Sequence, residues 1–383
     1  MTVTAADIAH MARALRLARQ GLFTADPNPR VGCVITDAGG VVVGEGYHRR
    51  AGEGHAEVVA LASAGSAAAG GTAYVTLEPC SHHGRTPPCA AALIAAGLRR
   101  VVYACDDPNP LVSGRGAREL RAAGIEVVTG VLANSAEALN VGFMTRMRTG
   151  MPWVRAKLAV SLDGRTALAN GMSQWITGAA ARADVHRWRA QSSAVLTGSG
   201  TVLADDPRLT SRLDGVADDA VVQPLRVVVD SRLRTPVGAR VLSGAAPALL
   251  AHCNGPADAA AALTAAGADV RKLPADESAR VDLRELLSVL AAAGCNEVLV
   301  EAGPRLNGAL LEAGLVDELI VYQASTVLGA DARGMFDLMP LSSMAERRQL
   351  QRTEVRIVGD DLRLRYRVVP PEAGTRELNK AGE

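Results

Sequence analysis

The sequence predicts two consecutive α/β domains. Over about the first 150 residues, segments with helical periodicity alternate with short apolar segments typical of strands. Gly150 and Pro152 then interrupt a helical stretch, and the alternation resumes beyond them. We therefore expect one domain over residues 1–148, a second over 149–370, and a polar, disordered tail over 371–383.

The first of these domains is expected to combine a mixed sheet with helices. Thr4 and Asp7 form a capping pair ahead of an amphipathic helix. Apolar runs at 31–37 and 41–48 flank Gly39-Gly40, which predicts a β-hairpin. The remaining expected elements are a helix near 55–64, a strand at 72–78, a helix at 89–97, a strand at 100–107, a helix at 115–124 and a strand at 125–131.

The second domain shows the same kind of alternation. Two apolar runs at its end, 355–359 and 362–368, are typical of an antiparallel hairpin. The other expected elements are strands at 154–162, 194–200, 226–231, 247–252, 297–303 and 317–325, with helices near 179–191, at 282–294 and after residue 303.

Composition argues against several classes of protein. The net charge is +1 and aromatic residues make up 3%, so the chain has neither a basic surface nor many side chains for stacking on bases. The N-terminus has no basic start followed by an apolar run, and no stretch has about 18 consecutive apolar residues. We expect a cytoplasmic protein that does not bind nucleic acid or membranes. The six cysteines are scattered, which argues against a disulfide framework.

Three residues of the first domain predict a metal site. His55 stands at the start of a helix, Cys80 follows a strand, and Cys89 opens the next helix. Because both helix starts can point at one spot, the three side chains can converge, and the helix dipoles favour thiolates. One imidazole and two thiolates are typical of a catalytic zinc that keeps a position open for water.

Glu57 lies two residues after His55, where it can move protons beside the zinc without binding it. The pair H-x-E and P-C-x-x-C is typical of zinc nucleobase deaminases, but here eight residues separate the cysteines. Within that insert, we interpret His82 and His83 as pocket residues, since a fourth protein ligand would close the site. The alternative of a zinc-stabilised scaffold without activity is disfavoured by Glu57 and by the missing ligand. The other cysteines lie in apolar contexts typical of core residues: Cys33, Cys105, Cys253 and Cys295.

The second domain lacks a G-x-G-x-x-G sequence after a strand, so a Rossmann site is not predicted. The segment 303–309, GPRLNGA, lies between a strand and a helix. Its backbone N–H groups, with two glycines that allow close approach, suit a pyrophosphate, although this signal is weak alone.

Long motifs in both halves are similar to the bifunctional deaminase/reductase family of riboflavin biosynthesis. The motifs lie at 27–35, 44–61, 74–89 and 107–116, and then at 157–167, 173–178, 202–210, 227–231 and 300–322. The eight-residue separation of the cysteines is itself a feature of that family. The resemblance implies a cytidine-deaminase-like α/β/α domain followed by a dihydrofolate-reductase-like α/β domain.

The resemblance also implies two consecutive reactions. The first domain would hydrolyse the exocyclic amine of 2,5-diamino-6-(5-phosphoribosylamino)pyrimidin-4(3H)-one, using Zn²⁺. The second would reduce the ribosyl chain of the resulting aminouracil to ribityl, using NADPH. The expected ligand is thus a pyrimidine ribose 5′-phosphate. A homo-oligomer through the reductase domain would be usual. A deaminase of nucleic-acid bases with an unrelated second domain is the runner-up, which the charge and the few aromatic residues disfavour.

The family resemblance assigns roles to particular residues. The zinc ligands are His55, Cys80 and Cys89, and the catalytic residues are Glu57 and Asp205. Residues expected to bind the cofactor are Ala159, Trp175, Thr201, Asp205, Ser231, Gly303, Pro304, Arg305, Leu306, Asn307, Gly308 and Ala309. Residues expected to bind substrate are Asn28, Ser173, Arg189, Leu209, Arg212 and Glu301.

Several of these assignments have structural alternatives. Asn28 can simply form a turn. Arg85, in the insert between the two cysteines, either binds the substrate phosphate or does not, and the sequence does not decide between the two. Arg208 joins Arg189 and Arg212 as a candidate for the phosphate, and the alternative for all three is a solvated surface. Lys157 and Asp163 hold the nicotinamide pocket or, equally, the rim of the core.

Overall fold

The computed structural model describes residues 3–81, 88–109, 113–244 and 246–369. They fall into two compact units. Unit 1 comprises Met1–Pro152 with Asp219–Val222 and Gly294–Asn296, and unit 2 comprises Trp153–Asp218, Gln223–Ala293 and Glu297–Glu383. His82, His83, Arg85 and the predicted tail lie outside the described residues.

A five-stranded mixed sheet forms the centre of unit 1, in the order β2-β1-β3-β4-β5. β1 is antiparallel to both of its neighbours, and β3, β4 and β5 are parallel. The hairpin predicted around Gly39-Gly40 is confirmed as β1–β2. The strand predicted at 72–78 is wrong at its end, because β3 stops at Val75 and residues 76–80 lead into the Cys80 turn. The strands are β1 (Gly32–Thr36), β2 (Val42–Tyr47), β3 (Thr72–Val75), β4 (Arg100–Tyr103) and β5 (Glu126–Thr129).

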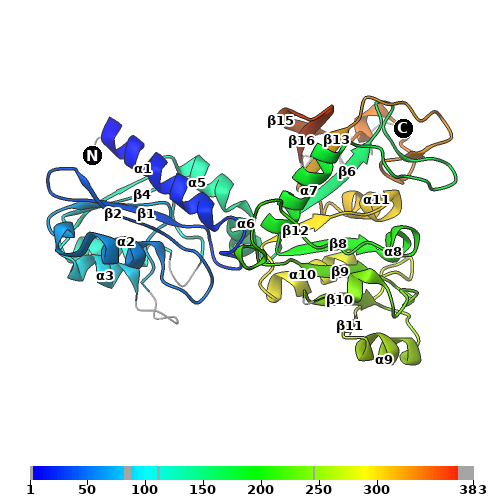
Figure 1. The fold of residues 1–383 in the computed structure, drawn as a ribbon, viewed down its shortest axis with the longest axis horizontal. Helices are drawn as coiled ribbons and strands as arrows, with labels where there is room; N and C mark the ends of the chain where they lie inside the picture. The colour runs from blue at the N-terminus through cyan, green and yellow to red at the C-terminus, as the bar shows by residue number, and fades with distance from the viewer. Residues whose placement is uncertain (1–2, 82–87, 110–112, 245, 370–383) are drawn as a thin grey trace, which may run out of the picture. The chain divides into compact units, whose positions relative to one another are not determined.

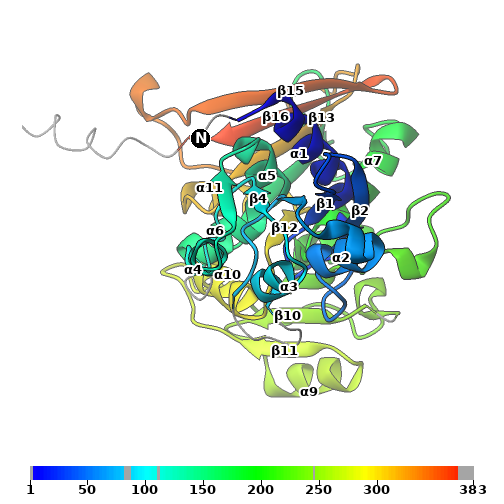
Figure 2. The same ribbon diagram turned by 90° about the vertical axis from the view of Figure 1, so that its left-hand side faces the viewer.

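Helices cover both faces of this sheet, which gives unit 1 three layers (Figures 1 and 2). Alternate strand residues point to opposite faces, so Cys33 packs with α2, α3 and α4, while Val34 packs with α1, α5 and α6. The predicted capping box between Thr4 and Asp7 is confirmed at the start of α1. The helices are α1 (Ala5–Ala18), α2 (Ala56–Ala64), α3 (Cys89–Ala95), α4 (Arg115–Ala122), α5 (Ala133–Leu139) and α6 (Val141–Thr149).

Unit 2 is built on a nine-stranded sheet in the order β11-β10-β9-β8-β12-β6-β13-β16-β15. The strands from β11 to β13 are parallel, and the predicted C-terminal hairpin β15–β16 joins β13 in an antiparallel manner. These strands are β6 (Trp153–Val160), β8 (Ala194–Gly198), β9 (Leu225–Val229), β10 (Ala248–His252), β11 (Asp269–Lys272), β12 (Glu297–Val300), β13 (Glu318–Gln323), β15 (Leu350–Val358) and β16 (Asp361–Val368).

Both faces of the parallel part are buried, as its near-continuous apolar strands require. Val195 packs with side chains of α7, α8 and α9, and its neighbour Leu196 is equally buried on the opposite face. A small sheet pairs β7 (Arg165–Ala167) with β14 (Arg333–Gly334). The helices are α7 (Ala179–Gln191), α8 (Ser199–Asp205), α9 (Ala257–Ala265), α10 (Leu283–Ala292) and α11 (Pro304–Glu312). Within the described residues, none of the helices is long and apolar enough to cross a membrane.

Candidate functional site

In unit 1, α2 places His55 and Glu57. His55 is the N-cap of α2, and Glu57 lies in its first turn. The helix can lie this close to β2 because Gly44 and Gly46 have no side chains. A Cβ on Gly46 would stand 2.5 Å from the carbonyl oxygen of Ala56, and a Cβ on Gly44 would overlap the α2 backbone. Two glycines of the strand therefore set how far His55 stands from the sheet.

The predicted ligand atoms of His55, Cys80 and Cys89 converge. All of them lie within 4.8 Å of one another. The His55 Nδ1 atom is 3.2 Å from Cys89 Sγ and 3.6 Å from Cys80 Sγ. Tetrahedral zinc bonds to nitrogen and sulfur require an N···S separation of about 3.5 Å. The three side chains thus fit zinc, and within the described residues they form the one such cluster.

The two thiols are held by the start of α3. The Cys89 N–H donates to Cys80 Sγ at 3.4 Å, and the Ala90 N–H donates to the Cys80 carbonyl at 3.1 Å. Hydrogen bonds from the Cys89 and His55 side chains lower the pKa of Cys80, although burial opposes them. The Cys80 thiolate and burial raise the pKa of the Cys89 thiol. This environment favours a thiolate at Cys80, which is the form that binds metal.

Glu57 is the acid of this site. Its side chain is 4% exposed, and burial followed by the neighbouring Cys80 thiolate raises its pKa to about 6. A carboxyl group in such surroundings can both accept and release a proton near neutral pH.

Asn28 has a partner that sequence reasoning missed. The Asn28 Nδ2 atom lies 3.0 Å from Nε2 of His48, and the His48 Nδ1 atom lies 3.1 Å from the carbonyl oxygen of Gly54. Nδ1 must donate to that carbonyl, so Nε2 accepts from the Asn28 amide. Burial lowers the pKa of His48, which keeps the ring neutral. The His48 ring also meets the His55 ring edge to face at 5.5 Å. The only signal in the sequence was the position of His48 inside the 44–61 motif.

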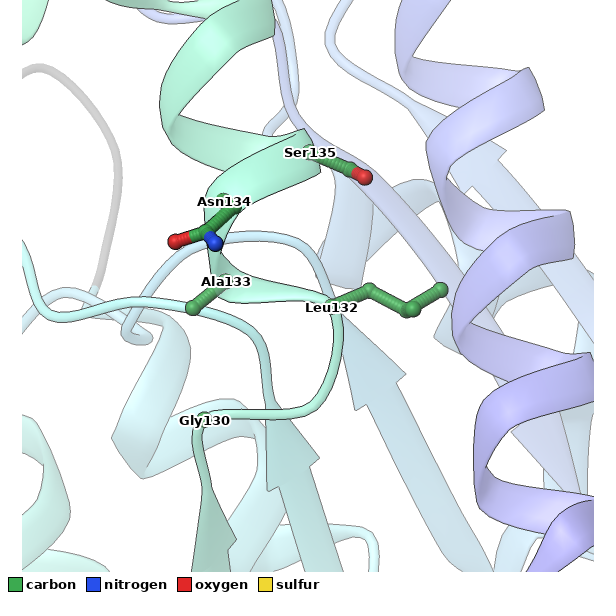
Figure 3. Close-up of a pocket in the computed structure, with 5 residues that line it drawn as sticks. All are labelled: Gly130, Leu132, Ala133, Asn134 and Ser135. Carbon is green, nitrogen blue, oxygen red and sulfur yellow. The ribbon is translucent and has the colours of Figure 1, made fainter.

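The other four cysteines are buried and unpaired, as predicted for core residues: Cys33, Cys105, Cys253 and Cys295. A separate hollow of about 390 Å³ lies at the start of α5 (Figure 3). None of the side chains that line it is titratable, and none was predicted to be functional: Gly130, Leu132, Ala133, Asn134 and Ser135.

In unit 2, the structure pairs two residues that the sequence assigned separately to substrate. Arg189 of α7 donates from Nε and Nη2 to the two carboxylate oxygens of Glu301, at 2.5 and 2.9 Å, and from Nη1 to the Thr210 carbonyl. Burial alone would raise the pKa of Glu301, but Arg189 lowers it to about 2. Lys157 of β6 is half-buried there, and its partial loss of solvent lowers its pKa. Three charged groups thus meet near the carboxyl ends of β6 and β12.

His186 connects Arg212 to the pair formed by Arg189 and Glu301. The Arg212 N–H donates to His186 Nδ1 at 3.2 Å, and burial followed by the charges of Arg189 and Arg212 lowers the pKa of His186 to about 4. His186 therefore supports the arginines as a neutral ring, and sequence reasoning did not find it. Arg208 is exposed.

The segment 303–309 forms the start of α11, with Gly303 as N-cap and Pro304 in the first turn. A Cβ on Gly303 or on Gly200 of α8 would meet nothing within 4 Å, so the backbone at both helix starts is open to a ligand. These N–H donors fit the pyrophosphate of a dinucleotide. The expectation that Gly308 allows approach of the pyrophosphate is wrong, because Gly308 accommodates the Asp337 carbonyl instead.

Along the same segment, Asn307 is buried, and its Oδ1 atom has no partner among the described residues. Arg305 is exposed and lies 4.0 Å from Asp337. The remaining positions of the segment are partly buried: Pro304, Leu306 and Ala309.

The next candidates lie on α8, which follows β8, and on the segment between β7 and α7. Thr201 and Asp205 belong to α8, and Gln174 next to Ser173 hydrogen-bonds the Asp205 carboxyl group. Asp205 is exposed, and partial loss of solvent around its carboxyl group raises its pKa. Trp175 is 70% exposed, with the Arg182 guanidinium 4.5 Å from its ring centroid.

Three candidates have structural contacts of their own. Leu209 is buried in the core and has a φ of 55°. The Ser231 hydroxyl accepts a hydrogen bond from the Val281 N–H. Asp163 accepts from the Ser161 hydroxyl and from the N–H groups of Leu328 and Gly329, so it anchors a loop. Ala159 is partly buried on β6.

Comparison with known proteins matches both units. Residues 4–105 match the family of the cytidine and deoxycytidylate deaminase zinc-binding region, and residues 152–364 match the RibD C-terminal domain. The chain is 51% identical over 372 residues to the riboflavin biosynthesis protein RibD of Escherichia coli (strain K12), covering 93% of this chain and 98% of that protein. It is 46% identical over 370 residues to RibD of Haemophilus influenzae, covering 94% and 97%.

Solved structures agree over the same extent. RibD of Acinetobacter baumannii (form 1) has a TM-score of 0.89 and 45% identity, covering 95% of this chain and 99% of that one. A protein from Thermotoga maritima, described as a diaminohydroxyphosphoribosylaminopyrimidine deaminase/5-amino-6-(5-phosphoribosylamino)uracil reductase, has a TM-score of 0.82 and 32% identity over the same shares.

Proposed function

The chain belongs to the RibD family of bifunctional riboflavin-biosynthesis enzymes, and we propose that the residues described above carry out both of its reactions. It is an enzyme with a zinc-dependent deaminase domain and an NADPH-dependent reductase domain. We assign deamination to residues 1–148 and reduction to residues 149–370. The substrates are those in the description of the Thermotoga maritima relative: a diaminohydroxyphosphoribosylaminopyrimidine, then 5-amino-6-(5-phosphoribosylamino)uracil.

The observation that carries the deaminase assignment is the convergence of His55, Cys80 and Cys89 beside the buried Glu57. Zinc on three protein ligands supplies a water whose pKa is lowered toward about 7. Glu57 takes the proton that the attacking water releases and passes it to a pyrimidine ring nitrogen. A second proton, from the hydroxyl group newly bonded to the ring, then passes through Glu57 to the leaving amine. Burial of Glu57 keeps that proton from exchanging with bulk water during the transfer.

Asn28 binds the first substrate through its carbonyl. Its NH₂ group is engaged by His48 Nε2, so the Oδ1 atom is left to accept from a ribose hydroxyl. Because the neutral His48 ring fixes the amide orientation, the Asn28 side chain is already oriented to accept a hydrogen bond before the substrate binds.

In the second domain, bound NADPH would supply the hydride for reduction at C1′ of the ring-opened ribosylamine. Within the segment 303–309, the N–H groups of the first turn of α11 hold its pyrophosphate, and Ala159, Trp175, Thr201 and Ser231 lie along the cofactor. Arg189 and Arg212 bind the substrate phosphate, with Ser173 and the Leu209 backbone beside it. Glu301 orients Arg189 and contacts the ribose, and Asp205 handles the proton of the new amine.

The two activities act in series, because the aminouracil that deamination produces is the substrate of the reductase. We further propose a homo-oligomer through the reductase unit and a cytoplasmic location. The edge strand β15 exposes Val355 and Ile357, at 54% and 75%, as an apolar strip that a second copy can cover. Six free cysteines suit a reducing compartment.

The test is a two-step assay with zinc-replete protein. Incubation with the diaminopyrimidine ribose phosphate is expected to release ammonia and yield the aminouracil. Adding NADPH is expected to oxidise the cofactor and yield the ribitylamino product, identified by mass spectrometry. Failure of both steps would overturn the proposal. Salt-sensitive RNA binding together with release of ammonia from RNA would instead favour a deaminase of nucleic-acid bases.

A further inference from the structure

A buried carboxylate lies two residues before the metal ligand Cys80. Glu78 is 3% exposed and has no cationic partner among the hydrogen bonds and ion pairs of the described residues. Its Oε2 atom accepts from the N–H groups of Gly114 at 3.0 Å and Asp107 at 3.4 Å, and its Oε1 atom accepts from Ala117 at 3.2 Å. Three backbone donors thus replace the water that this carboxylate loses on burial.

These donors tie Glu78 to the start of α4. Gly114 is the N-cap of that helix, and Ala117 lies in its first turn. The contact extends to Pro79, because a Cβ on Gly116 would overlap the Pro79 carbonyl oxygen. The backbone of the first turn of α4 therefore lies directly against the residue that precedes Cys80.

On its other side, Cys80 is held by α3, through the Ala90 N–H on its carbonyl and the Cys89 N–H on its sulfur. The main chain at Glu78 is fixed as well, because the Glu78 N–H donates to the Cys105 carbonyl at 3.0 Å. The turn that carries Cys80 is thus clamped between two helix starts. Only one of them, α3, contributes a metal ligand, and α4 contributes none.

We infer that Glu78, together with the glycine-fitted first turn of α4, positions Cys80 for the metal. The role of α4 is to set where the Cys80 sulfur stands relative to His55 and Cys89. This inference rests on the proposed zinc-dependent deamination. Glu78 is a positioning residue, since the three hydrogen bonds of its side chain go to backbone N–H groups and none goes to the side chains of His55, Cys80 or Cys89.

The chemistry explains why a carboxylate is needed. All three partners are N–H donors, so the site requires two acceptor oxygens. A glutamine at position 78 would place its NH₂ group against at least one backbone N–H donor. Two donors would then face each other, and that hydrogen bond would be lost. Aspartate keeps both oxygens but is one methylene shorter, so it can reach fewer of the donors at a time.

The experiment compares metal binding in the full-length chain and its variants Glu78→Gln, Glu78→Asp and Gly116→Ala. Glu119→Gln is the matched control, because Glu119 is an exposed glutamate on the same helix. Zinc affinity is measured by competition with a chromogenic chelator. The Co²⁺-substituted proteins are compared at saturating metal, since cobalt absorption reports ligand geometry directly. NADPH-dependent reduction of the aminouracil substrate serves as the control for the second domain.

We expect Glu78→Gln and Gly116→Ala to weaken zinc binding by about 10- to 100-fold, as loss of supporting contacts around a metal site commonly does. Glu78→Asp is expected between them and the wild type. The cobalt spectrum of Glu78→Gln should differ at saturation, which a general loss of stability would not produce. The control and the reductase rate should be unchanged.

Wild-type zinc affinity and an unchanged cobalt spectrum in both Glu78→Gln and Gly116→Ala would overturn the inference. If Glu78→Gln does not fold, Gly116→Ala and Glu78→Asp decide by the same two measurements. Equal weakening in Glu119→Gln would also overturn it, because the effect would then belong to any charge on α4. A wild-type protein that binds no zinc would instead refute the proposed function, so the two failures are distinguishable.

Discussion

Arg189 and Glu301 form a two-point ion pair, in which Nε and Nη2 of the guanidinium each meet one carboxylate oxygen, at 2.5 and 2.9 Å. A third N–H group donates to the Thr210 carbonyl. Two of the five guanidinium N–H groups remain, and we propose that they bind the substrate phosphate. The pair thus holds Arg189 in one orientation before substrate arrives, so that little side-chain entropy is lost on binding.

Arg189→Lys tests this arrangement, because it keeps the charge and removes the fork. We expect the KM of the reductase for its phosphorylated substrate to rise at least about tenfold, and the free energy of unfolding of unit 2 to fall by about 2 kcal/mol. Deamination is the internal control and should be unaffected. An unchanged KM would show that Arg189 only supports Glu301.

The same pair predicts a pH dependence of stability. The pKa of Glu301 is lowered from 4.5 to about 2, so the pair's stabilisation is complete above about pH 4.5 and is lost as pH falls toward 2. Glu301→Gln should destabilise unit 2 by about 3 kcal/mol at pH 7, because Arg189 loses its counter-charge. In denaturant unfolding, the difference between variant and wild type should shrink as the pH falls. A constant difference would contradict the pairing.

Glu57→Gln should abolish deamination and leave the metal in place. The amide cannot take the proton of the attacking water, and general acid–base transfer is worth about 10²- to 10⁴-fold in rate. Ammonia release measures the loss, and elemental analysis measures zinc. Residual deamination at the wild-type rate would exclude Glu57 as the proton carrier.

Cys80→Ser should separate the two activities. The hydroxyl is a poor zinc ligand, so zinc content and deamination are both expected to be lost. Reduction of chemically supplied aminouracil substrate by NADPH should persist, since every residue that we propose for the reductase site belongs to unit 2. Chelation of zinc from the wild type should reproduce this pattern. Joint loss of both activities would mean that the units do not work independently.

Asp7→Asn should lower the stability of unit 1. Asp7 is 1% exposed, closes the capping box with Thr4 and meets the Arg100 guanidinium at 2.6 Å. Hydrogen bonding to Arg100 holds the pKa of Asp7 well below its usual range. We expect a loss of about 3 kcal/mol at pH 7 that diminishes in acid, where the wild-type carboxyl group also becomes neutral. An exposed acid, Glu119→Gln, should leave the unfolding midpoint unchanged.

Much of the fold could be predicted because local patterns and tertiary packing agree. The β1–β2 hairpin follows from two apolar runs around Gly39-Gly40, and α1 from the Thr4–Asp7 capping pair. The prediction was wrong where packing overrode periodicity. Residues 76–78 continue the predicted strand in sequence, yet β3 stops at Val75, and the Glu78 side chain accepts hydrogen bonds from the N–H groups of Gly114 and Ala117 at the start of α4.

The candidate site was predictable where a residue type implies its chemistry. A histidine and two cysteines at helix and strand ends indicated a metal cluster, and the structure brings them within 4.8 Å. Partners that act through other side chains carried no such signal. His48 and His186 are ordinary in sequence, and their roles appear only when the chain places them against Asn28 and Arg212. The Arg189–Glu301 pair joins positions 112 apart, which no local pattern records.

Gly46 of β2 stands against the first turn of α2, where a single methyl group would press on the Ala56 carbonyl at 2.5 Å. The distance of His55 from its two thiol partners therefore depends on a position that bears only hydrogen. Adding a methyl group there would push the imidazole outward without altering any ligand. Mutagenesis of the charged and polar residues around this centre would not detect that dependence, because it arises from the absence of a side chain at position 46.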